Sequence, residues 1–224
     1  MKQEAELIHE RLKAPRSAAI AGILFSVLLI AGLFLFRLSV RADPLEAGAW
    51  LKTSSKTITL ALNLIPFAGI AFLWFIGVLR DRLGELEDRF FATVFLGSGL
   101  LFLAMLFASA AMAGGIIIAY AAKPAELLGS PTFTFARAAT YEVMNLYAVK
   151  MAAVFMISTS TLAIRTGFFA RWIAFLGYAF ALFLLLSGRY FEWILMLFPL
   201  WVLLVSIYIL IDNLRRPPQV PAID

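Results

Sequence analysis

The sequence predicts an all-α, polytopic integral membrane protein: a bundle of six transmembrane helices with a short helix at the membrane interface. Of its 224 residues, 62% are hydrophobic and 15% are charged, and the mean hydropathy is +0.91. Soluble domains are about half apolar and about a quarter charged. Apolar runs of about 18 residues or more, the length that a helix needs to cross a bilayer, recur along the whole chain. We therefore expect almost no soluble domain.

The first span is expected at about 17–36, after a polar, basic segment over 1–16 that we place in the cytoplasm. The alternative is a signal peptide cleaved after Ala42. It is disfavoured because the apolar run is about twice the length of a signal-peptide core and an arginine adjoins the cleavage point.

The second span is expected at about 57–79. Before it, Asp43-Pro44-Leu45-Glu46 is a helix-start pattern, in which the aspartate caps and the proline takes the first helical position. This pattern predicts the interfacial helix, near 44–51. Pro66 lies inside the second span and leaves the carbonyl of Leu62 without its helical donor, which predicts a kink.

The third apolar run, at about 90–120, is longer than a bilayer requires. At 1.5 Å per residue it would measure roughly 46 Å, so it must tilt, break near Gly114-Gly115, or project from the membrane. Small side chains recur along one face of this helix, and in lipid such a stripe lets two helices approach closely. The small-residue stripe consists of Gly97, Ala104, Ala108, Ala111 and Gly115. We predict that it is a packing face, used within the chain, in a homo-oligomer or in a larger membrane complex.

Three further spans are expected at about 140–164, 172–187 and 191–211, followed by a polar cytoplasmic tail over 212–224. An external loop is expected over 121–139, within which Ser130-Pro131 is an alternative start for the fourth helix. Pro199 lies inside the sixth span and predicts a second kink.

The distribution of basic residues predicts the orientation. With the N-terminus inside, the inner segments carry eleven Lys and Arg residues and the outer segments seven. The positive-inside rule therefore places both termini in the cytoplasm, with the chain in the plasma (inner) membrane of a bacterium. The net charge of +5 reflects basic residues at helix ends, where they meet lipid head groups, so we expect no nucleic-acid partner.

One stretch carries a resemblance to known sequences. The segment from Phe72 through Arg80-Asp81-Arg82 and Glu87-Asp88-Arg89 to Gly97-Ser98-Gly99 resembles a bacterial family of uncharacterised multi-pass membrane proteins. The resemblance covers residues 72–99. It implies membrane location and no particular chemistry.

Enzymatic chemistry has few residues available. The chain has no cysteine and one histidine, His9, which lies in the polar N-terminal segment. Thiolate metal sites, axial haem ligands and histidine-dependent catalytic triads therefore have no residues in the membrane. We expect no catalytic residues, no metal site and no cofactor.

The fourth span contains the polar residues that are hardest to place in lipid. Glu142, Asn145 and Ser160 share one helical face, and Lys150 lies about 80° away from Glu142. With Asn63 of the second span, these residues predict a polar path for an ion, a proton or a small solute. The alternative places Glu142 at the outer interface, with Lys150 snorkelling outward and the hydroxyls bonded within the helix. Asn63 would then satisfy the backbone carbonyl that Pro66 leaves free.

We therefore expect a non-enzymatic accessory or scaffold subunit that associates through helix–helix packing, in contact with the lipid bilayer. The alternative is a small ion or solute transporter, or a channel, that uses the polar path on the fourth helix.

Overall fold

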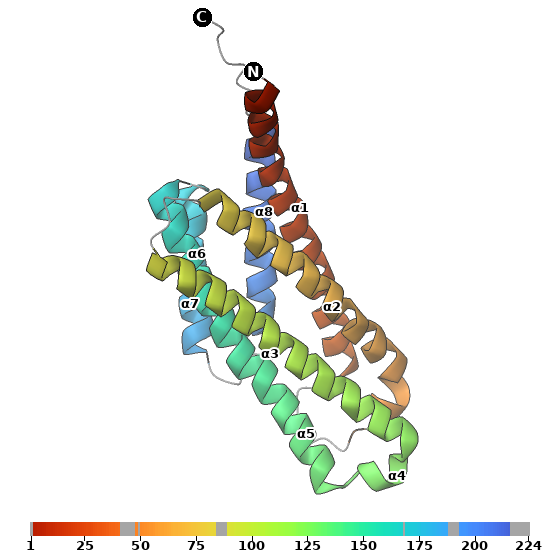
Figure 1. The fold of residues 1–224 in the computed structure, drawn as a ribbon. Coiled ribbons are helices and arrows are strands. Elements are labelled where there is room, and N and C mark those ends of the chain that lie inside the picture. Colours follow the sequence, from red (N-terminus) through yellow and green to blue (C-terminus); the bar gives the residue numbers. More distant parts are fainter. Residues whose placement is uncertain are drawn as a thin grey trace, which may run out of the picture.

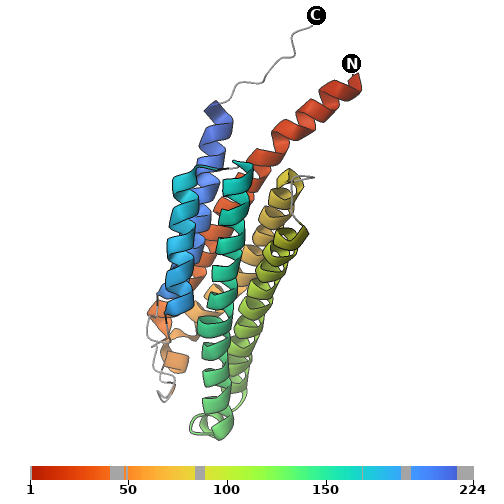
Figure 2. The ribbon, with the colours of Figure 1, turned by 90° about the vertical axis from the view of Figure 1, so that its left-hand side faces the viewer.

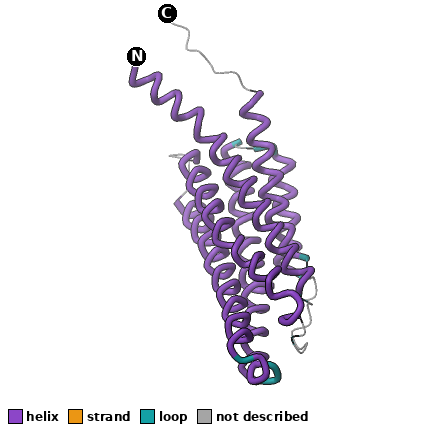
Figure 3. Tube along the Cα trace, turned by 90° about the vertical axis from the view of Figure 1, so that its right-hand side faces the viewer, coloured by secondary structure: helices purple, strands orange, loops and turns teal. Residues whose placement is uncertain are grey.

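The structure is a computed structural model that describes residues 2–40, 48, 50–83, 89–167, 169–187 and 193–215. Figure 1 shows the fold, and Figure 3 shows that helices joined by short turns make up these residues. The described part of the chain contains no strand. The prediction of an all-α protein is confirmed.

The helices follow one another along the chain as a series of antiparallel passes (Figure 1). They are α1 (Lys2–Ser39), α2 (Trp50–Leu83), α3 (Arg89–Ala122), α4 (Pro124–Leu127), α5 (Pro131–Glu142), the π-helix η2 (Val143–Ala148), α6 (Val149–Thr166), α7 (Arg171–Leu186), the 3-10 turn η3 (Ile194–Met196) and α8 (Leu197–Arg215). Within the described residues, five helical segments are long and apolar enough to cross a membrane: Ser17–Ser39, Trp50–Arg80, Thr93–Ala122, Pro131–Thr166 and Ile194–Arg215. The chain is therefore a membrane-embedded helical protein. The 16-residue α7 is shorter than these segments.

The helices begin earlier than the apolar runs that predicted them. Residues 50 and 51 form the first turn of α2 and do not belong to a separate interfacial helix; residues 41–47 and 49, on which the rest of that prediction falls, lie outside the described residues. Hydropathy detects the part of a helix that contacts lipid. The backbone hydrogen bonds of α2 extend further, through the polar residues 52–57. Helix α2 therefore begins seven residues before the start predicted for the second span.

The fourth helical segment begins at Pro131, within the stretch predicted as an external loop over 121–139. The side chain of Ser130 accepts a hydrogen bond of 3.1 Å from the backbone N–H of Phe133, and Pro131 occupies the first turn. This cap and proline start a helix although the residues that follow are only weakly apolar. The helical segment then continues through η2 to Thr166. Of the two predicted starts, Ser130-Pro131 and 140, the structure has the first.

Neither α3 nor α8 is interrupted. Helix α3 continues through Gly114-Gly115, and its 34 residues make a helix of about 51 Å. Figure 1 shows α2 and α3 inclined to α8, and inclination lets a long helix fit a bilayer. Pro199 is the third residue of α8, where the missing N–H removes no hydrogen bond from within α8.

A cluster of phenylalanine side chains occupies the centre of the bundle. Phe25, Phe72, Phe102, Phe155 and Phe198, from α1, α2, α3, α6 and α8, are all 0% exposed. Ring centroids are 4.5 Å apart for the pair from α1 and α2, and 4.7 Å apart for the pair from α3 and α8. Because lipid is as apolar as these rings, close fit and dispersion hold the helices together here. We call these five residues the phenylalanine cluster.

The helices pack closely wherever a glycine faces another element. A Cβ added to Gly177 of α7 would lie 2.9 Å from Nε1 of Trp201 in α8, and closer still to Oγ of Ser160 in α6. Only a glycine lets these three helices approach so closely.

The two ends of the bundle differ. The start of α1 and the end of α8 lie at one end, and α4 and the start of α5 lie at the other (Figures 1 and 2). Helices α7 and α8 stop short of this second end, so it consists of α1, α2, α3 and α5. The polar residues described next gather there.

Candidate functional site: an arginine-lined cavity

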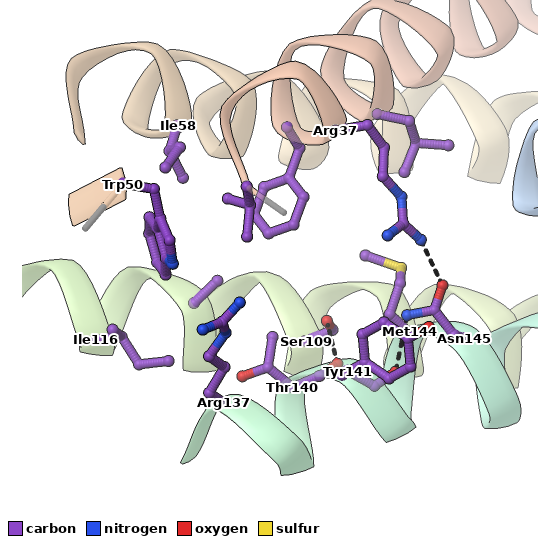
Figure 4. A pocket seen from close by; sticks show the side chains of 14 residues that line it. Arg37, Trp50, Ile58, Ser109, Ile116, Arg137, Thr140, Tyr141, Met144 and Asn145 are labelled. Atoms are coloured by element: carbon purple, nitrogen blue, oxygen red, sulfur yellow. Dashed lines mark hydrogen bonds between the residues drawn. The ribbon is translucent and has the colours of Figure 1, made fainter. Parts of the chain in front are cut away.

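A cavity of about 60 Å³ lies between α1, α2, α3, α5 and η2 (Figure 4). Each of these elements contributes a polar side chain to its wall: Arg37, Trp50, Ser109, Arg137 and Asn145, respectively. The rest of the wall is mainly apolar. Two guanidinium groups thus lie at the wall of one small cavity.

Arg137 is the more deeply buried of the two arginines, at 6% exposed. It lies two turns beyond the Ser130-Pro131 start of α5 and points across the cavity towards α2 (Figure 4). Its Cζ atom lies 5.7 Å from the centre of the Trp50 ring, a distance at which the cation is attracted by the face of the indole. The arginine and the tryptophan therefore hold α5 and α2 together at this end.

Arg37 reaches the cavity from the opposite side. One terminal nitrogen of its guanidinium donates a hydrogen bond of 2.6 Å to Oδ1 of Asn145. The amide nitrogen of Asn145 in turn donates to the backbone carbonyl of Tyr141, at 3.0 Å. These two bonds orient the amide between the two helices. Asn145 belongs to η2, and π-helical turns of this kind occur often at functional sites.

The floor of the cavity is fixed by a bond between α3 and α5. The buried hydroxyl of Ser109 donates to the backbone carbonyl of Thr140, at 3.0 Å. The hydroxyl of Thr140 donates within its own helix, to the carbonyl of Ala136. The wall is thus held by bonds that join distant parts of the chain.

Trp50 adds a donor that the fold does not use. The residue is 9% exposed, and its Nε1 atom is buried with no hydrogen-bond partner in the described part of the chain. Figure 4 shows the ring at the edge of the cavity, facing Arg137. Buried indole N–H groups are normally hydrogen-bonded. Trp50 therefore adds an unused N–H donor to the wall of the cavity.

Lys150, which the sequence placed in a polar path, has a structural role. Its Nζ atom donates to the backbone carbonyls of Leu184, Leu185 and Ser187, at 2.9, 2.5 and 3.1 Å. An ammonium group has three N–H donors, and these three carbonyls, at the C-terminal end of α7, use all of them. The positive charge also suits the negative end of the helix dipole.

The structure does not bring the other predicted path residues together. Glu142 is half-buried in the last turn of α5, whereas Ser160 is fully buried against Gly177 of α7. The π-turn between these two residues also changes the helical phase, so they do not follow the uninterrupted α-helical period that the prediction assumed. Asn63 is exposed on α2, and within the described residues no hydrogen bond joins its amide to the carbonyl of Leu62. Of the predicted set, Asn145 alone lines the cavity.

The small-residue stripe lies on the outer surface of the bundle. Its last four members are exposed and Gly97 is half-buried. A Cβ added to Gly97 or Gly115 would meet no atom within 4 Å. The stripe is therefore not a contact between described helices of this chain.

Sequence reasoning missed the arginine-lined cavity because its main residues lay in segments interpreted in other ways. Arg37 was placed at the end of the first span, Trp50 in the interfacial helix near 44–51 and Arg137 in the external loop. The signal that could have found the last was Ser130-Pro131, because a helix starting there places Arg137 in the same helical segment as Asn145. No feature of the sequence indicated that Arg37 of α1 would contact Asn145.

The chain was compared with known proteins. No protein family, no curated protein and no solved structure matches it.

Proposed function

We propose that the chain is a non-enzymatic accessory or scaffold subunit that associates with other membrane helices through the outer face of α3. The observation that carries this proposal is the position of the small-residue stripe, whose members Ala104, Ala108, Ala111 and Gly115 are exposed. Small side chains on the outside of a membrane bundle allow a second helix to approach its backbone closely.

A polar side chain beside the stripe supports the same face. Asn63 and Ala111 line one groove of about 390 Å³ between α2 and α3. An exposed amide in the middle of a span is costly in lipid, and amides hydrogen-bond across helix–helix contacts. An amide is both donor and acceptor, so two copies of Asn63 can bond to each other across a two-fold axis. We therefore propose a second copy of the chain as the partner.

The topology completes the proposal. We propose that α7 is a sixth span, because it lies antiparallel to α6 and α8 and leads the chain away from the end at which α1 begins, to which α8 then returns (Figure 2). The excess of Lys and Arg on that side favours cytoplasmic termini in a bacterial inner membrane.

Transport of a small ion or solute is the second candidate. The observation that favours it is Asn145, a residue of the predicted path that lines the arginine-lined cavity. It ranks second because Lys150 is committed to the end of α7, and the hydroxyls of Ser158 and Thr159 donate to carbonyls of their own helix.

The test measures association in a bilayer. Because the chain has no cysteine, a single cysteine added at the C-terminus can carry a donor or an acceptor dye. We expect energy transfer between wild-type copies in liposomes, decreasing on dilution with lipid. The Ala104→Leu/Ala108→Leu double variant should dissociate about tenfold more readily, which corresponds to ~1.4 kcal/mol of lost helix packing.

Ala179→Leu is the matched control, because Ala179 is exposed on α7, away from the stripe. It adds the same side chain to a lipid-facing position and should leave energy transfer unchanged. Wild-type copies that show no transfer at any lipid ratio, or an Ala179→Leu effect as large as that of the double variant, would overturn the proposal.

A further inference from the structure

Two hydroxyl groups in the wall of the arginine-lined cavity have acceptor capacity that the fold does not use. The buried hydroxyl of Ser109 donates to the backbone carbonyl of Thr140, and the hydroxyl of Thr140 donates to the carbonyl of Ala136. Both hydrogens are therefore committed, but neither hydroxyl oxygen accepts a hydrogen bond from the described part of the chain. A hydroxyl oxygen has two lone pairs. Ser109 and Thr140 thus offer the cavity acceptors and no donors.

Trp50 offers the opposite kind of group. The residue is only 9% exposed, and its indole N–H is buried without an acceptor among the described residues. Trp50 lines the same cavity as the two hydroxyls, and the three side chains come from α2, α3 and α5 (Figure 4). A buried donor without a partner is costly. An occupant that satisfies all three groups must therefore both accept and donate hydrogen bonds.

The two guanidinium groups do not select the occupant. Arg37 donates to Asn145, Arg137 lies over the ring of Trp50, and each arginine has a further interaction within the chain. A fully ionised anion could accept from the indole N–H but has no hydrogen to donate to the hydroxyl oxygens. An acyl chain would leave all three groups unsatisfied. The chemistry therefore favours a small neutral molecule with donors and acceptors.

The volume and the position of the cavity favour water within this class. The cavity measures about 60 Å³, which is enough for a small cluster, because one buried water needs roughly 10–15 Å³ and two to four polar partners. Arg37 follows the apolar run of α1, and Lys56 precedes the apolar run of α2, so the cavity lies at the edge of the hydrocarbon layer. Water is abundant at this level of a membrane.

We propose that the arginine-lined cavity is a hydration site, in which bound water accepts from the indole N–H of Trp50 and donates to the hydroxyls of Ser109 and Thr140. The water joins α2 to α3 and α5 at the end of the bundle that α8 does not reach. This site goes beyond the association proposed above, and none of the stripe residues lines the cavity. Loss of association would therefore leave the hydration site in place.

The experiment detects water at individual indole groups by NMR spectroscopy. The full chain is labelled with ¹⁵N at the indole nitrogens of its five tryptophans, and cross-relaxation between each indole proton and water is measured in detergent micelles. Single Trp→Phe variants assign the signals of Trp50 and Trp201. We expect a cross-peak between water and the indole proton of Trp50, with the sign given by water that tumbles with the protein.

Trp201 is the control within the same sample. Its indole N–H is also buried, but it donates to the backbone carbonyl of Ile173, at 3.3 Å. The hydroxyl of Ser160 lies beside this indole, where both face Gly177. A signal relayed by an exchanging hydroxyl proton would therefore appear at Trp201 as well. We expect Trp201 to show no cross-peak with water.

Three variants assign the acceptors. Thr140→Val removes one hydroxyl but keeps the branched shape of the side chain, so it should reduce the cross-peak of Trp50. Ser109→Ala/Thr140→Val removes both acceptors and should lose most of the cross-peak. Thr159→Val is the matched control, because Thr159 is buried, its hydroxyl also donates within its own helix, and it does not line the cavity. It should leave the cross-peak of Trp50 unchanged.

Three results would each overturn the proposal. They are a Trp50 indole proton without a water cross-peak, an equally strong cross-peak at Trp201, and a Trp50 cross-peak that Thr140→Val reduces no more than Thr159→Val does. If the double variant does not fold, the wild type and the two single valine variants still decide the outcome.

Discussion

The phenylalanine cluster and the arginine-lined cavity are built on the same helices and differ in almost every property. Helix α1 contributes Phe25 to the first and Arg37 to the second, twelve residues or about 18 Å further along. In the cluster five rings interlock and every one is fully buried. In the cavity, polar groups line a hollow.

The difference follows from which helices are present. Phe198 of α8 lies against Phe25, Phe72 and Phe102 and completes the cluster. Figure 1 shows that α8 does not extend to the level of α4 and α5. Where α8 is absent, guanidinium, amide and hydroxyl groups join the remaining helices by bonds of defined direction. Such bonds hold helices at set distances and can leave space between them, whereas dispersion rewards only close contact.

The largest expected effect tests the close-packed region. Phe72→Ala removes the ring that lies 4.5 to 5.7 Å from the four other members of the cluster. We expect the free energy of unfolding to decrease by about 3–5 kcal/mol, because the site cannot collapse fully around the cavity that forms. Unfolding in increasing mole fractions of sodium dodecyl sulfate measures this change.

The control for Phe72→Ala is Phe175→Ala on α7, where the ring is 63% exposed. It removes the same atoms from a lipid-facing position and should cost much less. Equal losses in the two variants would show that the cluster does not hold the bundle together.

An intermediate effect is expected at Lys150, the cation that lies between the two regions. Lys150→Met leaves three carbonyls at the end of α7 without their donor, and we expect a loss of ~2 kcal/mol in the free energy of unfolding. Lys150→Arg keeps the charge and N–H donors and should lose less. The same denaturation assay applies, and a Lys150→Met chain as stable as the wild type would contradict the capping role.

The smallest effect is expected in the wall of the cavity. Ala113 lines the arginine-lined cavity and is 7% exposed. Ala113→Val adds two methyl groups where there is space, so stability should remain within about 1 kcal/mol of the wild type or increase. Ala152→Val adds the same groups beside the phenylalanine cluster at a residue that is 0% exposed, and it should destabilise by about 1–3 kcal/mol.

Thermal unfolding of the two valine variants in detergent makes this last comparison directly. The contrast between the regions would not hold if Ala113→Val proved as destabilising as Ala152→Val.

Much of the fold was predictable, because each apolar run has lipid as its partner and needs no knowledge of its neighbours. Helical boundaries were less predictable. The starts of α2 and of α5 lie in polar sequence, outside the runs that hydropathy detects. The small-residue stripe was recognisable on α3, but whether it faced another helix of the chain depended on the packing of the whole bundle.

The candidate site was the least predictable feature. Asn145 was identified as a polar residue in a span, but its partner Arg37 lies 108 residues away. Lys150 looked equally functional from its sequence context, and the three carbonyls that use its donors come from α7, more than thirty residues later. No local pattern shows which distant groups a cation in a span will meet.

The sequence by itself therefore determined that this protein is helical and resides in a membrane, since composition and the length of apolar runs decide both. Only the tertiary structure decided which polar groups meet. The direction of each side chain depends on where its helix starts and on its phase, which a serine cap and a π-turn set for the fourth helix. Whether the groups that converge form a cap or a cavity then depends on how far the neighbouring helices extend.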